Sequence, residues 1–169
     1  MKAQNRLLEL AHYNLWCDRR LYKACAEIPK ETLHEDLKLY FRSIFGILNH
    51  NAIVAELWYS RIKGKPFARA HIHEEVGIGL VELAEVCERM DKVLCDYIKN
   101  TTKEKLAKVV EYQSTEGKKH AMDRESILFH LFNHQTHHRG QITAALESLG
   151  YDFEPLDYIA YLYEESRQG

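Results

Sequence analysis

The sequence is poor in residues that interrupt helices. It holds three prolines and eight glycines in 169 residues, with no low-complexity tract and no internal repeat. Proline breaks the interior of a helix and glycine weakens it. Long uninterrupted helices are therefore permitted along most of the chain, which is long enough to bury a substantial core without a disulfide or a structural metal.

Two further absences exclude whole classes of protein. No stretch approaches the roughly 20 apolar residues of a membrane span, and the first residues lack the apolar core of a signal peptide. Acidic and basic residues nearly balance at a formal net charge of −2, so the basic surface typical of nucleic-acid binding is missing. We expect a soluble cytoplasmic protein that binds neither membranes nor nucleic acids.

The four cysteines contain no Cys-x-x-Cys pair, which fits reduced thiols in a cytosolic protein. They are Cys17, Cys25, Cys87 and Cys95. Free cysteine behaves as a small buried hydrophobe, so we expect all four to pack in the core. A nucleophilic Cys17 is the alternative.

Apolar residues recur at helical intervals in four long segments. The period predicts helices over about 5–27, 37–62, 79–100 and 124–149. Residues 30–36 form a polar connector, and 67–77 have no steady period and are expected to be a loop. A small hairpin is expected over 109–122 with glycine at its turn, and a short last helix over 155–163. The sequence therefore predicts an all-α protein, a four-helix bundle that forms a single domain over 1–169.

The clearest functional signal is a group of histidines in the last long helix. His134 and His138 lie four residues apart, so their side chains meet on one face, about 6 Å apart, at metal-ligand spacing. His137 lies three residues from His134 and shares that face too, so spacing alone does not decide between His137 and His138. His130 is a further turn back, and one ion cannot reach all three turns. We expect His130 either to support the metal ligands from behind or to line a pocket.

A third ligand has to come from another segment, and His50 on the second predicted helix is the best candidate. Facing helices of a bundle commonly build metal sites in this way. Three neutral imidazoles leave a coordination position open, as in a catalytic site, where a divalent ion can activate water or a thiol. We expect zinc or nickel first, with iron, copper or manganese as alternatives, because imidazole suits several transition metals.

Other polar residues give weaker signals. No carboxylate stands out as a general base, because Glu56 lies about 120° around the helix from His50. Arg139 either holds an anionic group of a substrate or pairs with an acidic residue for structural reasons. Trp58 lies two turns beyond His50 and either lines a pocket or packs in the core.

The sequence resembles the DinB family of metal-dependent four-helix proteins, which is related to thiol-dependent YfiT-like transferases and mycothiol-dependent isomerases. The resemblance spans nearly the whole chain, and its most specific part is the run HLFNHQTHHRGQ. The segments that carry it are 13–16, 43–50, 57–58, 130–141 and 155–159.

The resemblance implies a bundle whose helices run up, down, down and up. It also implies a three-histidine site for a divalent metal at His50, His134 and His138, so the family pattern favours His138 over His137. It further implies a homodimer.

We expect a metal-dependent enzyme, a thiol-dependent S-transferase or a hydrolase, that acts on a small electrophile. A low-molecular-weight thiol is the candidate cosubstrate. One alternative is a non-catalytic metal-binding protein of the DNA-damage-inducible stress response. Another is an interaction module whose histidines pack without a metal.

Overall fold

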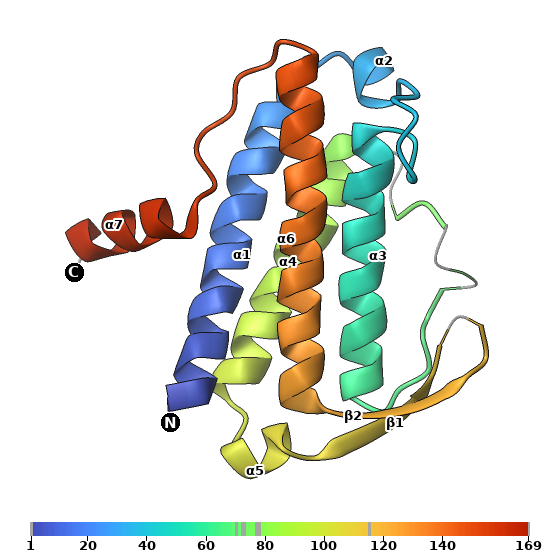
Figure 1. The fold of residues 1–169 in the computed structure, drawn as a ribbon, viewed down its shortest axis with the longest axis vertical. Helices are drawn as coiled ribbons and strands as arrows, with labels where there is room; N and C mark the ends of the chain where they lie inside the picture. Colours follow the sequence, from blue (N-terminus) through green and yellow to red (C-terminus); the bar gives the residue numbers. More distant parts are fainter. Residues whose placement is uncertain (1, 70, 72–73, 77–78, 115, 169) are drawn as a thin grey trace.

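Four long helices form a bundle in the computed structural model, which describes residues 2–69, 71, 74–76, 79–114 and 116–168. The helices run up, down, down and up along the chain (Figure 1). α1 packs mainly against α4, and α3 packs against both α4 and α6. The predicted fold class and chain direction are confirmed. The helices are α1 (Lys2–Ala26), α3 (Ile44–Ile62), α4 (Leu80–Lys99) and α6 (Arg124–Ser148).

Shorter elements lie at the two ends of the bundle, and α7 lies beside α1 (Figure 1). An antiparallel hairpin lies below the bundle between α5 and α6, with Gly117 at φ +80° in its turn (Figure 1). No described helix is long and apolar enough to cross a membrane. The short elements are α2 (Lys30–Leu33), α5 (Lys103–Leu106), β1 (Val109–Gln113), β2 (Lys119–Asp123) and α7 (Tyr158–Gln168). The predicted hairpin is confirmed.

The loop expected over 67–77 is described only in part. Residues 70, 72, 73 and 77 lie outside the described residues, and the others form no helix or strand. The connector expected over 30–36 contains the single-turn helix α2, which the sequence did not predict.

The prediction of a helix from residue 37 is wrong at its start. α3 begins at Ile44, where the side chain of Ser43 caps the helix by accepting a hydrogen bond from the amide of Gly46 at 3.0 Å. Before it, Lys38 and Arg42 have φ values of 60° and 68°. This left-handed conformation is incompatible with a continuing helix.

The last helix also begins later than predicted. The carbonyl oxygens of Pro155 and Leu156 accept hydrogen bonds from Arg20 and Tyr13 on α1. This part of the chain therefore runs extended along α1, and α7 begins only at Tyr158.

The buried apolar side chains form two clusters, one toward each end of the bundle. One surrounds α2 and includes Leu33 and Ile44. The other lies beside the hairpin and includes Val110 and Ile127. At positions between the two clusters, all four long helices contribute buried polar side chains, and we call this set the polar layer: Asn14, Asp18, His50, Asn51, Asp91, Gln135, His138 and Arg139.

One part of the polar layer is a hydrogen-bonded network that ties α6 to α1 and α4. The amide of Asn14 donates to Asp91 at 2.9 Å and to Asp18 at 3.3 Å. Arg139, which is 3% exposed, donates to the side-chain oxygen of Asn14 and lies 3.7 Å from Asp18. Buried polar groups are costly unless they are paired in this way, so the network fixes the height and rotation of α6.

The two carboxyl groups of this network, Asp18 and Asp91, differ in how strongly their surroundings raise the pKa. Burial, together with the Asp18 carboxylate, raises the pKa of Asp91 well above its usual range. Burial also raises the pKa of Asp18, but the Arg139 guanidinium opposes that effect. We infer that Asp91 holds the proton and that Asp18 carries the charge facing Arg139.

This assignment predicts different effects for two isosteric substitutions. Asp91→Asn keeps the shape of a protonated carboxyl group and should change the free energy of unfolding by less than about 1 kcal/mol. Asp18→Asn leaves Arg139 as an unpaired buried charge and should cost about 3–5 kcal/mol. Urea denaturation of both variants at pH 7 measures the difference, and equal losses would contradict the assignment.

Candidate metal centre

The structure brings together the three histidines expected to bind a metal. His50 comes from α3, and His134 and His138 come from α6. One ring nitrogen of each lies within 4.8 Å of the others, and the Nε2 atoms of His50 and His134 are 3.0 Å apart. His137 is exposed and is not part of this group. The geometry thus selects His138 over His137, as the family pattern does.

Two of the three imidazoles, His134 and His138, are held in the neutral form that metal binding requires. Burial, with a smaller effect of the neighbouring histidines, lowers the pKa of His134 from 6.5 to about 4. Burial also lowers the pKa of His138. The Nδ1 atom of His138 lies 2.7 Å from the amide oxygen of Gln141. Because this oxygen only accepts, Nδ1 carries the proton and Nε2 keeps the lone pair.

The donor set fits a divalent transition metal. Zinc–nitrogen bonds of about 2.0–2.1 Å place two ligand nitrogens on a tetrahedral ion roughly 3.3 Å apart, close to the His50–His134 separation of 3.0 Å. The group contains three imidazoles and no thiol or carboxylate. Such a set suits zinc, nickel, iron or copper better than calcium or magnesium.

An open cavity of about 650 Å³ adjoins His50. Phe41 lies at its wall and stacks on the His50 ring at 3.8 Å between centroids, and it meets the His138 ring edge-on at 5.4 Å. Glu75 supplies the carboxylate among the lining residues. His50 therefore faces a space that a small molecule can enter.

Sequence reasoning missed Phe41 and Glu75. Both lie on irregular segments, where no periodicity shows which way a side chain points. Glu75 is placed by Asn49 on α3, whose side chain bonds the backbone at Glu74 (3.0 Å) and Val76 (2.8 Å).

Two other candidate residues have structural roles in the described part of the chain. Arg139 belongs to the network with Asn14 and Asp18 and is turned away from the histidines. Glu56 pairs with Arg69, which agrees with its expected position on another face of α3. Neither is a candidate for chemistry at the three histidines.

The four cysteines are buried and free, as expected for packing residues. Burial raises the pKa of Cys17 to about 11. The thiolate is the nucleophilic form, so the alternative of a nucleophilic Cys17 loses its support.

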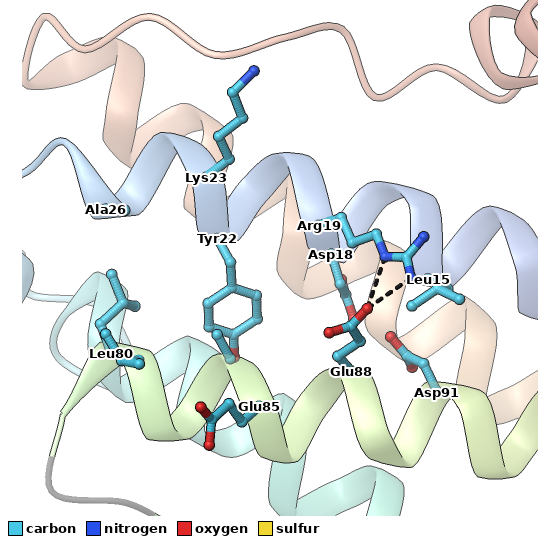
Figure 2. A pocket seen from close by; sticks show the side chains of 12 residues that line it. Leu15, Asp18, Arg19, Tyr22, Lys23, Ala26, Leu80, Glu85, Glu88 and Asp91 are labelled. Atoms are coloured by element: carbon cyan, nitrogen blue, oxygen red, sulfur yellow. Dashed lines mark hydrogen bonds and ion pairs between the residues drawn. The ribbon is translucent and has the colours of Figure 1, made fainter.

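A second cavity, of about 390 Å³, lies between α1 and α4 (Figure 2). Tyr22 and Leu80 face each other across it, and Asp91 points from α4 toward α1. Its lining residues include none of the three histidines. We assign it no part in the chemistry of the metal centre.

The start of α3 has no room for a side chain at Gly46. A Cβ atom there would overlap the carbonyl oxygen of Phe41. Gly46 therefore allows the close approach that places Phe41 over His50.

Gly46→Ala should displace Phe41 and lower the free energy of unfolding by about 1–3 kcal/mol. It should also weaken metal binding, measured by competition with a chromogenic chelator. Gly140→Ala on α6 is the matched control, because a Cβ there meets nothing within 4 Å. That control should stabilise the helix by about 0.5–1 kcal/mol and leave metal affinity unchanged.

The lowered pKa of His134 predicts how the metal-free protein responds to pH. Between about pH 6.5 and pH 4 the unfolded chain binds a proton that the folded chain excludes. The free energy of unfolding should therefore fall as the pH drops through this range. Denaturant titrations of the metal-free protein should show a shallower fall for His134→Gln, and identical slopes would contradict the prediction.

Comparison with known proteins places the chain in a family. The sequence matches the DinB family across residues 1–168. It is 31% identical over 159 residues to protein DinB of Bacillus subtilis strain 168, with 92% of each chain covered.

Two solved structures share the fold at low sequence identity. A DinB-like protein from Bacillus cereus ATCC 10987 gives a TM-score of 0.60 at 17% identity, covering 82% of this chain and 89% of that one. YfiT from Bacillus subtilis, described as a probable metal-dependent hydrolase with an unusual four-helix bundle topology, gives 0.62 at 10% identity, covering 88% and 89%. Together with the sequence matches, this shows that the chain belongs to the DinB family.

Proposed function

We propose that the protein is a metal-dependent enzyme in which His50, His134 and His138 bind a divalent transition metal, zinc or nickel first. Its reaction is a thiol-dependent S-transfer, or a hydrolysis, on a small electrophilic substrate. The observation that carries the proposal is the convergence of three imidazoles, one of which lines an open cavity of about 650 Å³. The description of YfiT as a probable metal-dependent hydrolase supports it.

The bound ion would supply Lewis-acid activation of water or of a thiol. The chain's own residues prepare the site for this. Gln141 fixes the tautomer of His138, and Phe41 shields one face of His50 from water. Glu75, on the cavity wall, is the candidate proton acceptor for the incoming water or thiol.

A non-catalytic role in metal binding finds less support in this geometry. A purely structural site is closed by four protein ligands. Here the group contains three donors, and His50 lines a cavity. We further propose, from the family resemblance, that the enzyme is a cytoplasmic homodimer, which sedimentation of the purified protein would test.

The test combines metal analysis with a screen of thiols and electrophiles on tag-free protein. Wild type should contain a stoichiometric transition metal and conjugate or hydrolyse a member of the screen. His50→Ala and His134→Ala should lose both properties, while the exposed His137→Ala keeps them. Gln141→Leu removes the acceptor at Nδ1 and should weaken metal affinity about 10- to 100-fold.

Two other outcomes would reject the enzyme hypothesis, and each favours a different alternative. A stoichiometric metal without turnover of any pair would favour the non-catalytic metal-binding protein. Absence of a metal from carefully purified wild type would favour the interaction module.

A further inference from the structure

Arg61 is a half-buried cation that lacks a carboxylate partner among the described residues. Its guanidinium carbon lies 4.4 Å from the ring centroid of Trp58 and 4.7 Å from that of Tyr112. It donates one hydrogen bond in the described part of the chain, to the carbonyl oxygen of Gln113 at 2.8 Å. A guanidinium has five N–H donors, so most of its hydrogen-bonding capacity is unused.

Two arginines near the metal centre are paired with carboxylates. Arg42, at the cavity beside His50, lies 3.3 Å from Asp36. Arg69 pairs with Glu56.

Arg124 is also half-buried and forms no ion pair with a described residue, but its guanidinium donates to the backbone carbonyls of Ile62 and Lys105. Arg61 differs from it because two aromatic rings hold its guanidinium, and a partly buried cation without a counter-charge is costly.

Arg61 lies on the same side of α3 as His50. Eleven residues separate them, so they differ by only about 20° around the helix and by roughly 16 Å along it. Arginine side chains on a helix lean toward its N-terminus, and Arg61 does so by reaching over Trp58. The guanidinium is therefore closer to the three histidines than the backbone spacing indicates.

A series of ring contacts connects Arg61 to the metal centre. Trp58 meets His130 edge-on at 4.9 Å between centroids, and His130 lies 5.8 Å from His134. Trp58 contacts both the Arg61 guanidinium and the His130 ring, so one indole links the two groups. His130 is exposed, so this series of rings is open to solvent.

We propose that Arg61, held by Trp58 and Tyr112, binds an anionic group of the substrate, a carboxylate or a phosphate, whose other end reaches the metal. The inference rests on the proposed function and deepens it by naming a substrate class. Arginine forms planar, charge-assisted hydrogen bonds with such oxyanions. The partner would thus be an extended molecule with a metal-binding head and an anionic tail.

The test uses terminal mercaptocarboxylates of increasing chain length, each matched with the corresponding mercaptoalcohol. Both bind cobalt-substituted protein through the thiolate, and thiolate-to-cobalt absorption reports binding without any turnover. Long carboxylates such as mercaptooctanoate should bind about tenfold tighter than their alcohols. Mercaptopropionate is too short to span the distance and should show no preference.

Arg61→Gln should abolish the preference for long carboxylates and leave mercaptoalcohol affinity unchanged, which also shows that the variant is folded. Arg61→Lys should retain part of the preference, because it keeps the charge and loses the planar fork. Arg19→Gln on α1, whose guanidinium pairs with Glu88, is the matched control and should behave as wild type. Arg42→Gln tests the rival cation at the cavity beside His50.

The outcomes separate the two proposals. If mercaptoalcohols bind cobalt but carboxylates of every length bind no tighter, the Arg61 subsite is wrong and the proposed function stands. A preference that survives Arg61→Gln and disappears in Arg42→Gln would also overturn the subsite. If the protein takes up no cobalt, the proposed function fails, and the subsite fails with it. If cobalt is bound but no thiol changes its spectrum, thiol-dependent S-transfer and the subsite fail, while hydrolysis at the metal stands.

Discussion

The polar layer across the middle of the bundle is the constraint on which the rest of the structure depends. A bundle with a purely apolar core can slide or rotate its helices at little cost, whereas buried polar groups must meet their partners. Asn14 and Arg139 satisfy this requirement between α1 and α6. The same register turns His134 and His138 toward His50, so the network on one side of α6 positions the imidazoles on the other.

Most of the helices could be predicted because their apolar residues keep a helical period, and the bounds of α1, α4 and α6 lie within about three residues of expectation. The start of α3 could not. Leu37, Leu39 and Phe41 continue an apolar pattern and pack against the apolar cluster at the α2 end of the bundle. They do so from a left-handed turn at Lys38 and Arg42, and no periodicity reveals such a turn.

The candidate site was predictable to the extent that it lies on helices. The four-residue spacing of His134 and His138 indicates a shared face, and His50 followed as the best third ligand. Phe41 and Glu75 come from segments whose path is set by tertiary contacts, such as the bonds from Asn49. The role of Arg139 also needed the structure, because its partners are far away along the chain.

The division of the core into two apolar clusters affects how such a protein can diverge. Substitutions at distant sites without shared partners have additive effects on the free energy of unfolding. The hairpin end, with Val110 and Ile127, can therefore be rebuilt without repacking Leu33 and Ile44 at the opposite end. Residues at one end of the bundle can therefore be substituted during evolution so that a different small molecule is bound. The histidines in the middle of the bundle keep their positions.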